Sequence, residues 1–222
     1  MFGENFTGEK AHPCKITTAM VLNNLRILKK LNPGDNYYDE YLKHFAREGE
    51  RFFDQYHLAI HFVQFAKPKR ILEIGVRTGL SICNMLSAYT DYSCIEKITL
   101  IDIWADGFAS PEIVKMNMRG LNFPELPIEF VKESSQTALV ALEGQKFGYV
   151  LVDGDHSKEA ATEDLKTCAP LVEQGGVIVF DDITPHGCNL QDVWDEFKAA
   201  HFHLFDFGEN QNGKGVGWGI KK

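Results

Sequence analysis

The sequence is poor in cysteine and pairs none of it closely. The five cysteines are an odd number with no CxxC spacing: Cys14, Cys83, Cys94, Cys168 and Cys188. Disulfide frameworks need cysteine pairs in small secreted chains, and a zinc ribbon needs paired CxxC motifs. The sequence therefore argues against both kinds of scaffold.

Long hydrophobic runs are also missing. No stretch approaches the roughly 18 apolar residues of a membrane helix, and the first fifteen residues contain no apolar h-region of a secretory signal. From these absences we expect a cytoplasmic protein with no membrane partner.

Positive charge is scarce relative to negative charge. Lys and Arg number 23 against 31 Asp and Glu, which gives a net charge of −8. Without a basic stripe, nucleic acid is not an expected partner, whereas a small anionic ligand is still compatible with this charge. The 222 residues, 44% hydrophobic and 24% charged, suit one compact globular domain rather than a disordered chain.

The first third of the chain reads as helical. Apolar residues recur at helical spacing over 16–31, and Asn-Pro-Gly-Asp at 32–35 ends this stretch. A second stretch over 37–66 carries an aromatic stripe that we expect to face the core: Phe45, Phe52, Phe53, Tyr56, Phe62 and Phe65. We predict that residues 1–66 form a helical cap or extension, used as a lid over a site or to build a homo-oligomer.

From residue 70 onward the pattern changes to short apolar runs that alternate with amphipathic stretches. The apolar runs lie at 70–75, 97–102, 128–133, 147–154 and 176–182, and the amphipathic stretches at 80–90, 111–120, 135–144, 158–174 and 190–201. This alternation predicts an α/β fold, a doubly wound, Rossmann-like, mostly parallel sheet covered on both faces. The runs at 202–207 and 216–222 predict a C-terminal antiparallel hairpin, so the second unit spans 67–222.

Ligands of such sheets bind at the carboxyl ends of the strands, which directs attention to the polar residues there. The first strand ends in Glu73-Ile-Gly75-Val-Arg-Thr-Gly79-Leu-Ser81. Glycines allow a tight turn and close approach of a ligand, and Glu73 suits a cationic ligand. The spacing is GxxxG, and a simple strand-to-helix turn is the alternative interpretation.

The next two strand ends carry residues suited to a nucleoside. Asp102 could accept hydrogen bonds from a ribose diol, or it could be a solvated carboxylate. After the third strand, Ser135 and Gln136 suit an adenine edge, although Ser134 or Ser135 could equally cap the following helix.

Carboxylates gather at the fourth and fifth strand ends. Asp153 follows one strand, and Asp181 and Asp182 follow the other, so a parallel sheet would bring the three together. Without a basic partner they would repel one another unless a divalent cation lay between them. All-oxygen ligands favour Mg²⁺, with Ca²⁺ or Mn²⁺ as alternatives. Helix caps or solvated loop acids would explain them without a metal.

From about Lys69 to its end the chain resembles the class I S-adenosylmethionine-dependent methyltransferases. The resemblance implies that Gly75, Gly79 and Ser81 hold the methionine portion of the cofactor and that Glu73 faces its ammonium group. It also implies that Asp102 binds the ribose. Ser135 and Gln136 match the adenine-contacting pair of the catechol O-methyltransferase branch.

The segment Asp153-Gly-Asp-His156-Ser followed by Asp181-Asp182 narrows the resemblance. It is similar to the metal-dependent O-methyltransferases of macrolide sugars and to the group related to cephalosporin hydroxylases. This implies that Asp153, Asp181 and Asp182 hold the metal, with Asp153 and His156 at the reacting centre and His156 as the general base. Catechol enzymes have Asn and Lys where this chain has Asp182 and His156, and Lys158 departs from the aromatic common in such motifs.

The expected protein is therefore a metal-dependent O-methyltransferase using S-adenosylmethionine and Mg²⁺. Its first expected acceptor is a sugar or sugar-bearing natural product, and its second is a catechol-like phenol. One rival is a non-haem iron oxygenase with a triad of Asp153, His156 and His186. The other is a non-catalytic protein that only binds S-adenosylmethionine.

Overall fold

The computed structural model describes residues 15–48, 54–105 and 107–222. Three residues singled out in the sequence, Cys14, Phe52 and Phe53, lie outside the described residues. Within the described part, no helix is both long and apolar enough to cross a membrane.

A seven-stranded sheet forms the centre of the molecule, in the order β3-β2-β1-β4-β5-β7-β6. Its strands are β1 (Arg70–Ile74), β2 (Lys97–Ile101), β3 (Ile128–Val131), β4 (Phe147–Val152), β5 (Val172–Asp181), β6 (Phe205–Asn210) and β7 (Val216–Lys221). The first five strands run parallel, and β7 pairs antiparallel with both β5 and β6. The predicted α/β fold with its C-terminal hairpin is confirmed. Strand order reverses between β1 and β4, where such sheets bind ligands.

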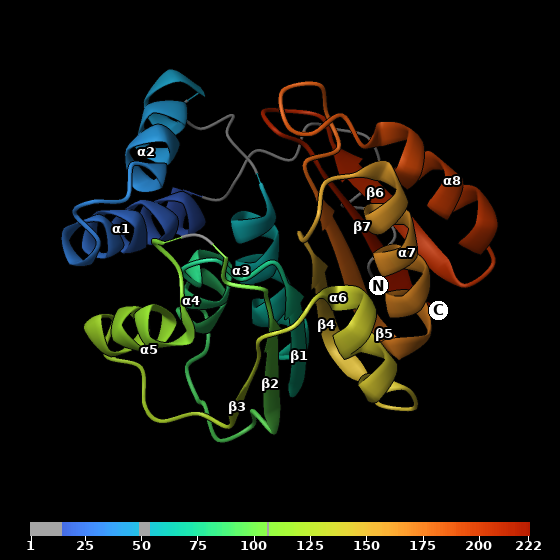
Figure 1. Cartoon of the computed structure of the whole chain (residues 1–222), viewed down its shortest axis with the longest axis horizontal. Helices are drawn as coiled ribbons and strands as arrows, with labels where there is room; N and C mark the ends of the chain where they lie inside the picture. Colours follow the sequence, from blue (N-terminus) through green and yellow to red (C-terminus); the bar gives the residue numbers. More distant parts are fainter. Residues whose placement is uncertain (1–14, 49–53, 106) are drawn as a thin grey trace.

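Helices cover both faces of the sheet (Figure 1). On one face lie α1 (Lys15–Leu31), α2 (Tyr37–Glu48), α3 (Gln55–Ala66), α4 (Leu80–Leu86) and α5 (Pro111–Gly120). On the other face lie α6 (Ser135–Ala138), α7 (Lys158–Cys168) and α8 (Gln191–His201). All six residues of β4 are buried, as expected for a central strand with helices on both sides.

Several element boundaries differ from the sequence prediction: the helices predicted over 80–90 and 135–144 end at Leu86 and Ala138, and the strand predicted over 202–207 lies at Phe205–Asn210. Two further differences have clear local causes. The stretch 37–66 contains two helices, and α3 begins afresh where the Asp54 carboxylate caps the backbone N–H groups of Tyr56 and His57. The helix predicted over 158–174 ends at Cys168, and a short 3₁₀ turn that contains Pro170 leads directly into β5. Proline cannot continue a helix, so β5 gains residues that the pattern had assigned to α7.

Candidate active site

A cavity of about 480 Å³ lies at the carboxyl ends of the parallel strands. It is lined by the loops after β1 to β5, by Tyr37 and Tyr56 of the N-terminal helices, and by Lys214 of the β6–β7 loop. Eight residues predicted from the sequence line it: Gly75, Ser81, Asp102, Ser135, Gln136, Asp153, His156 and Asp182. The sheet therefore brings polar residues from five separate strand ends to one cavity.

The loop after β1 turns sharply at its glycines. Gly75 has φ +82°, and a Cβ built on it would lie 1.7 Å from the backbone oxygen of Asp153. Gly79 has φ +79° and is the N-cap residue just before α4; a Cβ built on it would lie 2.8 Å from a methyl group of Val114. Both positions favour glycine for steric reasons. The backbone turn therefore explains the GxxxG motif even without a ligand.

Glu73 lies behind this loop and does not line the cavity. Glu73 is only 2% exposed. Its Oε1 has no hydrogen-bond partner in the described part of the chain. Burial, followed by the nearby charge of Asp153, raises the pKa of Glu73 well above its ordinary value. Its predicted contact with a cofactor ammonium group stays a prediction.

Asp102 is fixed by the backbone on both sides. Its Oδ2 accepts a hydrogen bond from the Arg77 N–H at 2.7 Å, and its Oδ1 accepts one from the Trp104 N–H at 2.6 Å. A carboxylate has about four lone-pair positions, so each oxygen retains room for a further donor such as a ribose hydroxyl.

The residues after β3 combine a helix cap with a polar wall. Ser134 is the cap of α6, because its Oγ accepts from the Thr137 N–H. Gln136 donates from Nε2 to Asp164 Oδ1 at 3.2 Å. Ser134, Ser135 and Gln136 all line the cavity, and Asp164 of α7 orients Gln136.

The three aspartates after β4 and β5 converge as predicted from the topology. Oxygens of Asp153, Asp181 and Asp182 lie within 4.8 Å of one another. Nε2 of Gln55, the first residue of α3, bridges two of them, at 2.8 Å from Asp153 Oδ2 and 2.9 Å from Asp181 Oδ2. The Asp54 cap that starts α3 therefore also places Gln55 against the cluster.

The expectation that no basic group accompanies these carboxylates was wrong. Lys214 Nζ lies 3.0 Å from Asp182 Oδ1, carried there by the loop between β6 and β7. Lys214 lies in a hairpin loop far along the chain. A prediction based on the residues that follow the parallel strands therefore could not place its ammonium group here. One signal was present: Lys214 is the sole basic residue of the polar stretch 208–215.

A divalent cation fits this donor set. Burial and then repulsion by Asp182 raise the pKa of Asp153 to about 6, and burial with repulsion by its two neighbours raises that of Asp181 well above its ordinary value. Asp181 Oδ1 is buried without a hydrogen-bond partner among the described residues. Three carboxylates with a spare buried oxygen form the hard oxygen set that Mg²⁺ or Ca²⁺ prefers.

His156 stands at the edge of the acidic cluster. Its Nε2 lies 3.7 Å from Asp182 Oδ2, and its side chain is 40% exposed toward the cavity. His186 is exposed. Among the described residues it belongs neither to the aspartate cluster nor to a second group of potential metal ligands formed by His156, Asp182 and Cys188. The arrangement does not assemble the Asp153, His156 and His186 triad of the oxygenase alternative.

Together these features define the class. A doubly wound sheet with an antiparallel β7, a glycine turn after β1 and acidic residues after β2, β4 and β5 form the architecture of a class I methyltransferase. A family model described as a methyltransferase domain matches residues 72–183, half of the chain. The chain belongs to this family, and the methyltransferase predicted from its motifs is confirmed.

Solved structures share this fold at low identity. An O-methyltransferase from Bacillus cereus in complex with SAH has 16% identity and a TM-score of 0.63, covering 90% of this chain and 91% of its own. SAH-bound PaMTH1 from Podospora anserina has 17% identity and a TM-score of 0.61, covering 91% and 88%. A ribosomal protein L11 methylase from Lactobacillus delbrueckii subsp. bulgaricus has 16% identity and a TM-score of 0.52, covering 76% and 77%.

A search of curated proteins found no match. At these identities the solved structures establish the fold alone, and their names span different acceptors. The acceptor must therefore be argued from this chain's own cavity.

Proposed function

We propose that this protein transfers the methyl group of S-adenosylmethionine to a hydroxyl oxygen of a small molecule, with Mg²⁺ or another divalent cation held by Asp153, Asp181 and Asp182. A sugar or sugar-bearing natural product is the first acceptor class, and a catechol-like phenol is the second. One observation carries the proposal: a single cavity joins the glycine turn after β1 to this acidic cluster.

The half of the cavity formed by β1 to β3 suits the cofactor. The turn at Gly75 allows close approach, Asp102 offers acceptors to ribose hydroxyls, and Ser135 with Gln136 offers polar groups to an adenine edge. These residues would hold the sulfonium end toward the ends of β1 and β4, where Asp153 stands.

The half formed by β4 and β5 suits a hydroxyl acceptor. In the transfer, a bond forms between the acceptor oxygen and the methyl carbon while the carbon–sulfur bond breaks, and its electron pair stays on sulfur. The metal would supply Lewis-acid stabilisation of the ionised acceptor oxygen. His156 would receive the hydroxyl proton, since an imidazole nitrogen can accept a proton and its Nε2 lies at the edge of the cluster, 3.7 Å from Asp182 Oδ2.

The acidic cluster also argues against a protein that only binds the cofactor. Holding S-adenosylmethionine does not need three clustered aspartates, two of them buried, on two further strands. Clustered carboxylates destabilise the metal-free fold, and binding a ligand would explain why the protein retains them.

Cofactor turnover tests the proposal. Release of S-adenosylhomocysteine is measured with a panel of sugars, glycosylated natural products and catechols, with and without EDTA. We expect turnover with a hydroxylated acceptor that EDTA abolishes and Mg²⁺ restores. Asp153→Asn and His156→Ala should each lower kcat at least about 100-fold.

Glu159→Gln is the matched control, because Glu159 is an exposed carboxylate in the first turn of α7. It should keep wild-type turnover. Undiminished turnover in EDTA would refute the metal role, and turnover that needs Fe(II) and O₂ would favour the oxygenase instead.

A further inference from the structure

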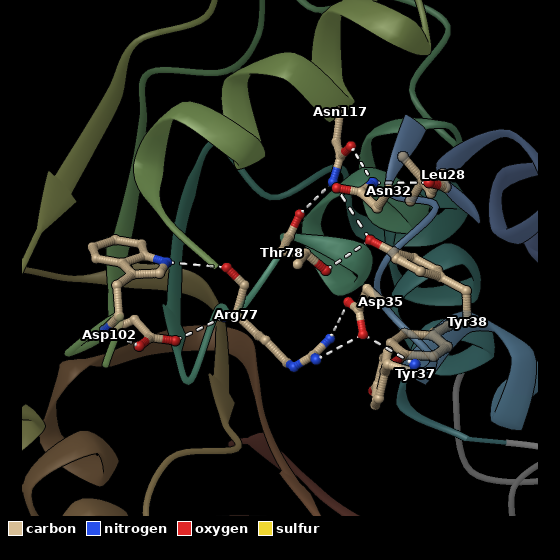
Figure 2. A network of polar contacts seen from close by, with 11 residues as sticks. Leu28, Asn32, Asp35, Tyr37, Tyr38, Arg77, Thr78, Asp102 and Asn117 are labelled. Atoms are coloured by element: carbon tan, nitrogen blue, oxygen red, sulfur yellow. Dashed lines mark hydrogen bonds and ion pairs between the residues drawn. The ribbon is translucent and has the colours of Figure 1, made fainter. Parts of the chain in front are cut away.

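The turn between α1 and α2 reaches across to the loop after β1 (Figure 2). Asp35 lies in this turn and is 6% exposed. Its carboxylate forms a two-pronged ion pair with Arg77, in which Nη1 donates to Oδ2 at 2.7 Å and Nη2 to Oδ1 at 2.9 Å. Paired N–H donors fix the orientation of a carboxylate as well as its distance.

Arg77 is held from the opposite side through its backbone. It has φ +50°, a conformation unusual for a residue with a side chain. Its N–H donates to Asp102 Oδ2 at 2.7 Å, and its carbonyl oxygen accepts from the Trp104 indole N–H at 3.0 Å. One residue thus connects the N-terminal turn to the carboxylate at the end of β2.

Neighbouring contacts tie the next residue of the loop in the same way. Thr78 accepts a hydrogen bond at Oγ1 from the Tyr38 hydroxyl at 2.8 Å, and at its carbonyl from Asn117 Nδ2 at 2.9 Å. Asn32 in turn donates to Asn117 Oδ1 at 2.8 Å. The N-terminal turn and α5 therefore hold the loop after β1 together (Figure 2).

Tyr37 connects this network to the cavity. The Arg77 guanidinium lies over the Tyr37 ring, 4.4 Å from its centroid. The backbone N–H of Tyr37 donates to Asp35 Oδ1 at 3.0 Å. Both Tyr37 and Arg77 line the cavity. The network thus spans the boundary predicted at residues 66 and 67 and forms part of the site wall.

We infer that Asp35 is a positioning residue for the cofactor: by fixing Arg77, it fixes the loop after β1 and the orientation of Asp102. The inference rests on the proposed cofactor role of that loop. Without Asp35, the half-buried guanidinium of Arg77 loses its two-pronged ion pair, and the strained backbone of Arg77 loses one of the contacts that hold it. The loop then samples other conformations, and part of the binding free energy is spent on ordering it.

Calorimetric binding of S-adenosylhomocysteine, with no acceptor and no turnover, tests this inference. Asp35→Asn and Arg77→Gln should each weaken binding about 10- to 100-fold, and the double variant should be no weaker than the worse single variant. Asp35→Glu, which keeps the charge, should recover part of the loss. At saturating S-adenosylmethionine, kcat of Asp35→Asn should lie within about threefold of wild type, because the change falls on KM for the cofactor.

Asp39→Asn is the matched control, because Asp39 forms a half-exposed ion pair with Lys29 on the neighbouring helices. It should bind the ligand as wild type does. Wild-type affinity of Asp35→Asn with only a lower unfolding temperature, or additive losses in the double variant, would overturn the inference while leaving the proposed function intact. Failure of wild type to bind the ligand would overturn both.

Discussion

At the scale of single residues, the groups that face the cavity are held by buried groups behind them. Asp164 illustrates this arrangement: it is 1% exposed, and its Oδ1 accepts from the side chain of Gln136. Its Oδ2 is buried without a partner among the described residues. Burial raises the pKa of Asp164 to about 6, so its charged form is disfavoured in the folded protein.

Asp164→Asn should therefore change how stability depends on pH. A carboxyl group with a raised folded pKa favours the folded state below its unfolded pKa, near 4, and loses that contribution as pH rises through 6. The uncharged amide does not titrate. The unfolding free energy of the variant relative to wild type should thus increase by about 1–2 kcal/mol from pH 4 to pH 8.

Urea unfolding at pH 4, 6 and 8 measures this difference. Glu163→Gln is the control, because Glu163 is an exposed carboxylate beside Asp164 on the same helix. Its difference from wild type should stay nearly constant with pH. A constant difference for Asp164→Asn as well would show that the Asp164 pKa is the same in both states.

Residues at strand ends could be predicted, whereas their supports could not. Asp102, Asp153 and Asp182 follow buried strands, so topology alone brings them to one edge of the sheet. Asp35 and Lys214 come from a helix turn and a hairpin loop, whose positions depend on how side chains pack. No periodicity in the sequence encodes those contacts.

At the scale of elements, the apolar pattern predicted the strands well because each central strand is buried on both faces. The ends of the helices were harder to predict, because local features decide them: the cap at Asp54 starts α3, and the turn at Pro170 follows α7. The ends of β1 and β4 approach one another closely. Gly75 has its N–H bonded to Ile101 and its Cα facing the Asp153 carbonyl.

Gly75→Ala should be far more destabilising than a glycine substitution at an open turn. A methyl group 1.7 Å from the Asp153 oxygen would force β1 and β4 apart, in addition to the strain of φ +82°. Gly144 has nearly the same φ, +79°, with nothing within 4 Å of a built Cβ. We expect a loss above about 3 kcal/mol for Gly75→Ala and about 1 kcal/mol for Gly144→Ala.

Equilibrium unfolding of the two variants compares the clash directly, since backbone strain is common to both. Binding of S-adenosylhomocysteine by any folded Gly75→Ala protein should also be weakened, whereas Gly144→Ala should bind normally. Equal losses of stability in the two variants would mean that the strand ends separate freely.

At the scale of the whole molecule, distant parts of the sequence converge on the acidic cluster. Gln55 comes from the N-terminal helices, the aspartates from the middle of the chain and Lys214 from the C-terminal hairpin. Part of the net charge of −8 is therefore concentrated in one buried place. Stability and ligand binding therefore oppose one another here. The carboxylates that would bind a cation repel one another when no cation is bound, and this repulsion lowers the stability of the fold.

Asp181→Asn should accordingly act in opposite directions on the two properties. In EDTA the variant should be more stable than wild type by about 1–3 kcal/mol, because it removes a buried carboxyl whose ionisation its neighbours oppose. With excess Mg²⁺ wild type should gain stability by mass action, whereas the variant should gain little. Asp206→Asn, at a carboxylate 79% exposed, should leave both properties unchanged. Thermal unfolding of wild type and the two variants, with EDTA and with Mg²⁺, measures both effects. A full Mg²⁺ response in Asp181→Asn would remove Asp181 from the proposed metal site. An Asp181→Asn protein less stable than wild type in EDTA would contradict the repulsion within the cluster.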